Sequence, residues 1–220
     1  AELAVGLITQ HEVSPKGVLK LSCPIGFAHA HLKPIISEYL QRYPNVSLDL
    51  DLSDKRTDVI ADGYDLAIRA SSQLDESSLI CRKLYSCGAF TVASKEYISR
   101  HGKPYHPHEL ATHHGICYSN LKFPSRWEYI DKDGKPFSVD VRPKAICNNG
   151  HMQLAMVLEG HGIARLPQFY MHEAMKNDLL EVLFEDFPTT TVNVFVIYPS
   201  RKHLSPKVRA FIDLAAERLG

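Results

Sequence analysis

The chain has 220 residues, of which 45% are hydrophobic and 23% are charged, so its composition is that of a globular protein rather than a disordered or collagen-like one. This length suits one large domain or two smaller domains that share a cleft. Twenty-five basic and 25 acidic residues cancel, so no overall positive field attracts DNA or an anionic membrane. No apolar run reaches the roughly 18 residues that a membrane-spanning helix needs.

The first residues predict the end of a helix. Apolar residues between positions 3 and 8 precede Ser14-Pro15-Lys16-Gly17, a sequence that ends helices. No helix-start signal comes before them, so we expect residues 1–14 to be the end of a longer helix. The N-terminus has an acid at Glu2 and no basic segment, so it does not resemble a signal peptide.

The segment that follows alternates strands and helices. Residues 18–21 predict a short buried strand. The run VSLDLDLS, residues 46–53, alternates apolar and polar residues strictly, which indicates a half-buried strand at a sheet edge. A third strand, DLAIR, ends at Arg69. Strands and helices that alternate over about 55 residues imply parallel strands with right-handed crossovers.

A helix is predicted between the first two strands. Apolar residues between positions 32 and 43 recur every three or four residues, which places them on one helical face. Proline is unfavourable inside a helix but harmless in its first turn. We therefore expect a short turn at residues 26–31, followed by a helix whose first turn holds Pro34.

Two long extended runs, residues 83–94 and 189–199, separate the rest of the chain into parts. Between them we expect a helix capped by Ser94, a hairpin-like excursion at 119–143, and a second strand–turn–helix–strand unit at 144–167. A final helix with Ser205 at its cap is expected to return to the first half. The predicted fold class is therefore α/β, with two Rossmann-like lobes joined by two crossover segments.

The cysteines and histidines do not form a metal or catalytic motif. Five cysteines are scattered without a C-x-x-C pair, so we expect buried free thiols in a reducing cytoplasm. Five histidines between His101 and His114 lack metal-ligand spacing and indicate a solvated loop. His29 and His31 are expected at a surface or cleft rim, where a ligand role stays open. No catalytic residue, cofactor or metal site is predicted.

Two helices are expected to begin directly after buried strands, at Gly26-Phe27 and at Asn149-Gly150-His151. Unpaired N–H groups and the helix dipole at such starts favour an anion or another hydrogen-bond acceptor. Two such starts across a cleft, with Arg69 at a nearby strand end, would suit a small carboxylate. The alternative is that Asn148 or Asn149 only caps its own helix.

Six blocks in order resemble the effector-binding domain of LysR-type transcriptional regulators. The blocks are GVLKLSCP, HLKPIISEYLQRYPNVSLDLDLSD, DVIADGYDLAIRA, LDESSLICRKLYS, VASKEYISRHGKP and LEGHGIARLP. The resemblance covers roughly residues 15–215 and rests on the order and separation of the blocks rather than on any single one.

This resemblance implies two lobes like those of type II periplasmic binding proteins, with lobe I at 15–88 plus 196–220 and lobe II at 89–195. It also implies an N-terminal winged helix-turn-helix that binds DNA in the full-length protein and is missing here, with residues 1–14 as the end of the linker helix. Family members form homodimers or homotetramers in the cytoplasm, and paired domains often meet through the segments that correspond to 31–43 and 46–53.

The resemblance places a small-molecule effector, an organic acid or an aromatic metabolite, between the lobes. The family's cleft positions correspond here to Pro24, Ile25, Gly26, Phe27, Arg69, Ser71, Tyr118, Asn149, Gly150, His151 and Arg165. Many relatives have Ser or Thr in the first junction, whereas this chain has Pro24-Ile25-Gly26. Either backbone N–H groups recognise the effector here or the effector is more apolar.

The expected mechanism is that effector binding closes the lobes, changes how these domains pack and so changes DNA binding by the full-length protein. A free-standing periplasmic-type solute-binding protein is the alternative with the same architecture. A third possibility is an α/β enzyme that uses Cys23 or the histidines, such as a prephenate dehydratase-like activity. Cys23 lies near a helix start, which can lower a thiol pKa.

Overall fold

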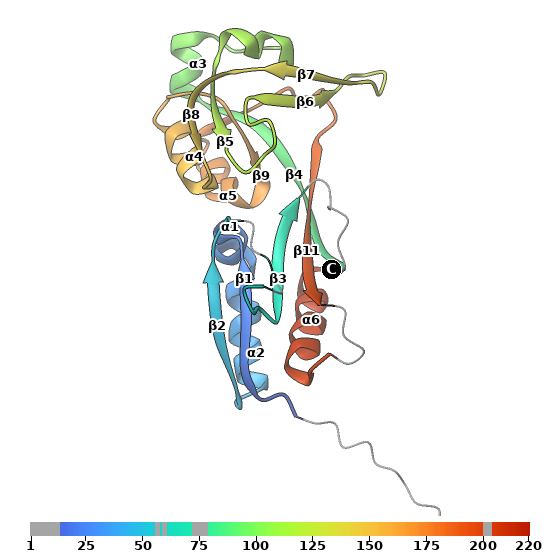
Figure 1. Ribbon diagram of the computed structural model, residues 1–220. Coiled ribbons are helices and arrows are strands. Elements are labelled where there is room, and N and C mark those ends of the chain that lie inside the picture. The colour runs from blue at the N-terminus through green and yellow to red at the C-terminus, as the bar shows by residue number, and fades with distance from the viewer. Residues whose placement is uncertain (1–13, 56–57, 59–60, 72–78, 200–203) are drawn as a thin grey trace, which may run out of the picture.

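The protein forms two α/β lobes joined by two long strands (Figure 1). The structure is a computed structural model that describes residues 14–55, 58, 61–71, 79–199 and 204–220. The predicted linker helix at 1–14 lies outside these residues except for Ser14.

Lobe I is built on three parallel strands, β1 (Gly17–Cys23), β2 (Val46–Leu52) and β3 (Leu66–Ser71). Strand β1 pairs in parallel with both β2 and β3, and β2 lies at the edge of the sheet, which confirms the predicted parallel arrangement and edge position.

Two helices pack together on the lobe I sheet. Helix α2 (Lys33–Arg42) contacts α6 (Pro206–Leu219) through the rings of Tyr39 and Phe211, whose centroids are 5.3 Å apart. The hydroxyl of Tyr39 also donates to the carbonyl of Lys207 at 2.7 Å. Both rings are fully buried. The prediction that the last helix returns to the first lobe is confirmed.

The turn predicted at residues 26–31 is wrong, because this segment is helical, whereas the predicted helix with Pro34 in its first turn is confirmed. A short α1 (Ile25–Phe27) runs into a π-helical turn (Ala28–Leu32) and then into α2. A π turn contains one more residue than an α turn and changes the local hydrogen-bond ladder. This wider turn ends two residues before Pro34, whose ring and missing N–H disrupt regular α-helical bonding. The chain therefore accommodates the proline without leaving the helix.

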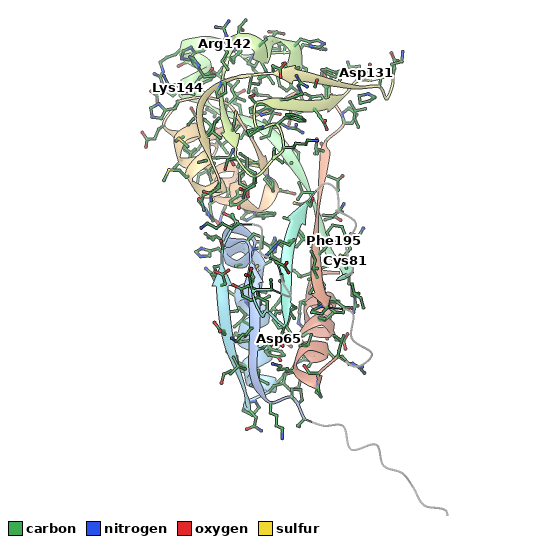
Figure 2. The ribbon with its side chains drawn as sticks, viewed as in Figure 1. Asp65, Cys81, Asp131, Arg142, Lys144 and Phe195 are labelled. Carbon is green, nitrogen blue, oxygen red and sulfur yellow. The ribbon has the colours of Figure 1, made fainter. Side chains whose placement is uncertain are left out.

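The two predicted extended runs are the strands that connect the lobes, β4 (Leu79–Ser94) and β11 (Thr190–Pro199). They pair antiparallel along the whole of β11. Figure 2 labels Cys81 and Phe195, which lie on these neighbouring strands. The complete sheet has the order β10-β4-β11-β3-β1-β2, and β9 also pairs with β4.

Lobe II surrounds the far end of β4. Its elements are α3 (Lys95–His101), a 3-10 helix (Pro107–Thr112), β5 (His114–Tyr118), β6 (Arg126–Ile130), β7 (Pro136–Asp140), β8 (Arg142–Cys147), α4 (Gly150–Leu158), β9 (Ala164–Pro167), α5 (Gln168–Lys176) and β10 (Leu180–Leu183). The β6–β7 hairpin and the Ser94 cap of α3 confirm the predictions. Asp131 lies just after β6, in the turn of this hairpin (Figure 2).

Two cores lie in lobe II. One packs α4 and α5 against the sheet through residues such as Val157, Leu166 and Met171. The other packs the hairpin and α3 around Trp127 and Tyr129. The alternation of side chains along β4 and β9 sends neighbouring residues to different cores. This alternation decides on which side of the sheet each polar residue of β9 lies.

The cysteines are free, as predicted, and three of the five are buried, namely Cys23, Cys87 and Cys117. Cys81 and Cys147 are partly exposed. Within the described ranges, no group of three or more His, Cys, Asp or Glu side chains is arranged to hold a metal ion. None of the helices that the structure describes is long and apolar enough to cross a membrane.

Candidate functional site between the lobes

The first predicted helix start lies at the end of lobe I nearest lobe II, where β1 leads into α1 (Figure 1). Pro24 is the N-cap residue of α1, and its side chain makes no capping hydrogen bond. The N–H of Ile25 instead donates to Oδ1 of Asp54 at 3.3 Å. A free helix N–H group in a partly buried place needs an acceptor. Here the chain itself supplies a carboxylate.

The second predicted helix start lies in lobe II, where β8 runs into α4. Asn149 caps this helix, since its side-chain oxygen accepts a hydrogen bond from the N–H of Met152 at 2.9 Å. Its Nδ2 donates to Oδ2 of Asp54 at 3.3 Å. The alternative that Asn149 caps its own helix is thus correct, and the same side chain also reaches the other lobe.

Asp54 joins the two helix starts. One carboxylate oxygen accepts from lobe I at Ile25 and the other accepts from lobe II at Asn149. The backbone carbonyl of Asp54 also accepts a hydrogen bond from Asn120, whose Nδ2 lies 3.1 Å from the hydroxyl oxygen of Tyr118. Burial raises the pKa of Asp54, while its two hydrogen bonds and the nearby His151 act in the opposite direction.

Tyr170 fills the space beside both helix starts. A Cβ atom added at Gly26 would lie 2.1 Å from Cε1 of Tyr170, and one added at Gly150 would lie 2.4 Å from its Cζ. The two glycines therefore allow one tyrosine ring of α5 to pack on backbone from both lobes. We call the group of Gly26, Asp54, Asn149, Gly150 and Tyr170 the interlobe contact.

Aromatic side chains line the interlobe contact. Phe27 lies with its ring centroid 5.8 Å from that of Phe169 on α5, which links the lobes, and 5.1 Å from that of His31. The His29 ring of lobe I lies 5.8 Å from the His151 ring of lobe II, and both residues are exposed. His29 and His151 thus form part of the rim.

Several predicted site residues lie near the interlobe contact, but not all of them do. The members brought together at the helix starts are Pro24, Ile25, Gly26, Phe27, Asn149, Gly150 and His151, with Tyr118 next to them through Asn120. Arg69 lies on β3 and points to the neighbouring strand β1, where it donates a hydrogen bond to Ser22 Oγ at 3.2 Å. Ser71, at the end of β3, pairs in register with Asn193 on β11.

Arg165 lies elsewhere. Its guanidinium donates to the hydroxyl of Thr190 and lies over the Tyr129 ring, 4.8 Å from the centroid. Tyr129 belongs to the hairpin core, on the other side of the lobe II sheet from α4 and α5. The side chain of Arg165 therefore borders a different part of the molecule from the helix starts.

Cys23 is poorly suited to nucleophilic catalysis. Its side chain is fully buried, and burial raises the pKa of the thiol well above its usual range. Catalytic cysteines need a stabilised thiolate, whereas this one is held as the neutral thiol.

Asp54, Asn120 and Tyr170 were missed by reasoning from the sequence. Asp54 stands among several acids after an edge strand, and Tyr170 is one aromatic residue in an amphipathic helix. The glycines at both helix starts were a usable signal, because a glycine at a buried helix start often marks a close approach.

Three comparisons with known proteins indicate the same family. A family model described as the LysR substrate binding domain matches residues 13–220. An HTH-type transcriptional regulator of Haemophilus influenzae, named uncharacterized, is 31% identical over 202 residues, which are 91% of this chain and 69% of that protein. The regulator CrgA of Neisseria meningitidis serogroup C is 29% identical over 97% of this chain and 71% of its own length.

Solved structures match over nearly the whole chain. The regulatory domain of CrgA, a LysR-type transcriptional regulator, has a TM-score of 0.81 and 28% identity, and the match covers 94% of this chain and 100% of that domain. Full-length AphB of Vibrio cholerae shares the fold with a TM-score of 0.81. These relatives are transcriptional regulators, which favours a regulatory domain over a free-standing solute-binding protein. The chain belongs to the LysR substrate-binding domain family.

Proposed function

We propose that this regulatory domain binds a small effector at the interlobe contact and that the effector takes the place of Asp54 at the two helix starts. The observation that carries the proposal is that one carboxylate accepts hydrogen bonds from both lobes, at Ile25 and Asn149. Donors that hold an internal carboxylate can hold the carboxylate or carbonyl of a ligand in the same way.

The chemistry around the helix starts supports a small acid with an aromatic or apolar body. Ser22 is fully buried, accepts a hydrogen bond from Arg69 and faces Asp51, so its hydroxyl is engaged within lobe I. Recognition would then rest on backbone N–H groups and Asn149. Phe27 and Phe169 provide an apolar wall beside them.

Exchange of Asp54 for an effector provides a means of regulation. Asp54, Asn120 and Tyr170 already hold the lobes together, so a ligand that displaces these contacts changes how the lobes meet. A ligand shifts a conformational equilibrium only by its difference in affinity for the two states, and coupling of about 1–3 kcal/mol is typical.

The full-length protein would transmit this change to DNA in the cytoplasm, through an N-terminal winged helix-turn-helix. We propose that it works as a homodimer or homotetramer whose domains meet through residues 31–43 and 46–53. Large apolar side chains on these elements support such a contact, since Leu40 is 37% exposed and Leu50 and Leu52 are each 38% exposed.

The test is a thermal-shift screen of the chain with small carboxylic acids, aromatic metabolites and amino acids. A ligand present at 100 times its Kd should stabilise the protein by about 2.7 kcal/mol. Small-angle scattering and sedimentation then show whether that ligand changes the shape of the domain and its assembly. A bound effector that changes neither would contradict the proposed mechanism.

Site variants locate the binding. Asn149→Ala removes a lobe II donor and should weaken effector binding by about tenfold, the effect of one charge-assisted hydrogen bond. The neighbouring Asn148 is exposed, and Asn148→Ala should leave binding unchanged. Equal binding by both variants would place the effector elsewhere.

A further inference from the structure

A cavity of about 290 Å³ lies in lobe II, away from the interlobe contact. Its wall includes Thr91 of β4, Arg165 of β9, Leu183 of β10 and residues 187–190 before and at the start of β11. We call it the lobe II cavity. Tyr129 of the hairpin and Met175 of α5 both border it, so the cavity is lined by side chains from both sides of the sheet.

Arg165 is a half-buried cation without an acidic partner. In the part of the chain that the structure describes, its guanidinium forms no ion pair, and its contacts are the Thr190 hydroxyl and the face of the Tyr129 ring. Burial lowers the pKa of Arg165, which reflects the loss of hydration around the charge. Buried charges in proteins are ordinarily paired with an opposite charge.

Two carboxylates lie in the neighbourhood, but neither forms an ion pair with Arg165, although the charge of Glu128 acts to raise its pKa. Glu128 is exposed, and its side chain alternates to the opposite face of the hairpin from Tyr129. Glu185 borders the cavity and is also exposed. The guanidinium of Arg165 therefore borders the cavity without an ion pair. A negatively charged hydrogen-bond acceptor bound in the cavity could pair with it.

The remaining wall of the cavity is suited to an apolar body. Phe90, Phe184 and Phe187 border it together with Val182 and Leu183. The hydroxyls of Thr91 and Tyr129 lie 2.9 Å apart and are hydrogen-bonded to each other, so this part of the wall is held in place. Ligand pockets are typically apolar with a few fixed polar groups, and their volumes start near about 300 Å³.

We propose that the lobe II cavity is a second ligand site, which binds a small monocarboxylate with an aromatic or aliphatic body. The carboxylate pairs with the guanidinium of Arg165 and the apolar body lies against the phenylalanine side chains. Thr190 pairs in register with Ala89, so the ligand would rest where the two crossover strands meet. This site is separate from the interlobe contact and does not depend on the function proposed for it.

The experiment uses phenylacetate as the probe, because it combines a carboxylate with one aromatic ring. Titration of the 220-residue chain, followed by backbone amide NMR, should give saturable shifts at Thr91, Leu183 and Thr190. The uncharged analogue phenylacetamide should bind at least tenfold more weakly, since it cannot form the ion pair. If millimolar phenylacetate causes no saturable shift at these residues, the proposal is wrong.

Three variants test the role of Arg165. Arg165→Gln should weaken phenylacetate binding by at least tenfold. Arg142 lies on β8 and is exposed (Figure 2), so Arg142→Gln is a control for the loss of one positive charge and should leave binding unchanged. If Arg165→Gln does not fold, Thr190→Val tests the same wall and should weaken binding severalfold.

A fourth variant separates the two sites. Asn149→Ala alters the interlobe contact, and phenylacetate should bind this variant at the lobe II cavity as it binds the parent chain. If Asn149→Ala abolishes the shifts at Thr91 and Thr190 while Arg165→Gln keeps them, the probe binds between the lobes and the second site is refuted.

Discussion

The interlobe contact is built around a negatively charged side chain and is filled, whereas the lobe II cavity is bordered by a positively charged side chain and is open. Between the lobes, a carboxylate from the chain, Asp54, meets the donors of two helix starts, and a tyrosine ring fills the adjoining space. In the lobe II cavity, a guanidinium meets a ring and a hydroxyl, and open space remains beside it. Asp54 is held by hydrogen-bond donors from both lobes, whereas Arg165 has no ion pair among the described residues and borders a cavity.

The largest expected effect comes from filling the glycine position under Tyr170. Gly26→Ala places a Cβ atom 2.1 Å from the Tyr170 ring, so the ring must move, at a cost of about 1–3 kcal/mol in the free energy of unfolding. Urea denaturation measures this change. In a Tyr170→Ala background the clash is gone, and the same substitution should cost less than about 0.5 kcal/mol. Equal costs in both backgrounds would show that Tyr170 does not fill this space.

The next largest effect is expected from removing the hydrogen bond between Thr91 and Tyr129 in the wall of the lobe II cavity. Tyr129→Phe leaves the buried hydroxyl of Thr91 without the partner that lies 2.9 Å away, at a cost of about 1.5 kcal/mol. Chemical denaturation measures it. Tyr105 is 78% exposed, so Tyr105→Phe is the matched control and should change stability by less than about 0.5 kcal/mol.

A smaller effect is expected at the cap of α4. Asn149→Ala removes both the cap to Met152 and the hydrogen bond to Asp54, and should cost about 1 kcal/mol of stability. Asn149→Asp keeps an acceptor for the cap but sets a second carboxylate beside Asp54. If the aspartate variant is as stable as the parent at neutral pH, the hydrogen bond between Asn149 and Asp54 does not contribute to the free energy of unfolding.

The smallest effect is a pH dependence from Asp54. Its pKa is raised in the folded state above the ordinary value of 3.8, so the folded protein binds more protons than the unfolded chain in the window just above that pH. The free energy of unfolding therefore falls as pH rises through this window. Asp54→Asn should remove that part of the slope in urea denaturation at several pH values. An unchanged slope would mean that Asp54 titrates normally.

Much of the fold could be predicted from local patterns. The strict alternation in 46–53 identified an edge strand, and the long extended runs identified the strands that connect the lobes. The prediction failed at residues 26–31, where Pro34 argued for a turn. A π-helical turn resolved that conflict, and such a turn has no clear sequence signal.

The candidate site was predicted only in part. Both helix starts and Asn149 could be identified because each follows a buried strand in the sequence. Asp54 could not, since its partner Asn149 lies 95 residues further along the chain. Arg165 was placed between the lobes by resemblance, but β9 sends its side chain toward Tyr129.

The sequence by itself determined the order of strands and helices, the parallel first lobe, the glycines at the helix starts and the family. These features depend on residues close together in the chain, or on blocks in a fixed order. Only the tertiary structure decided that Asp54 satisfies both helix starts, that Tyr170 covers them, and that Arg165 borders a separate cavity. Each of these depends on which face of a strand or helix meets another element, and alternation along a strand defines two faces without saying what packs on either.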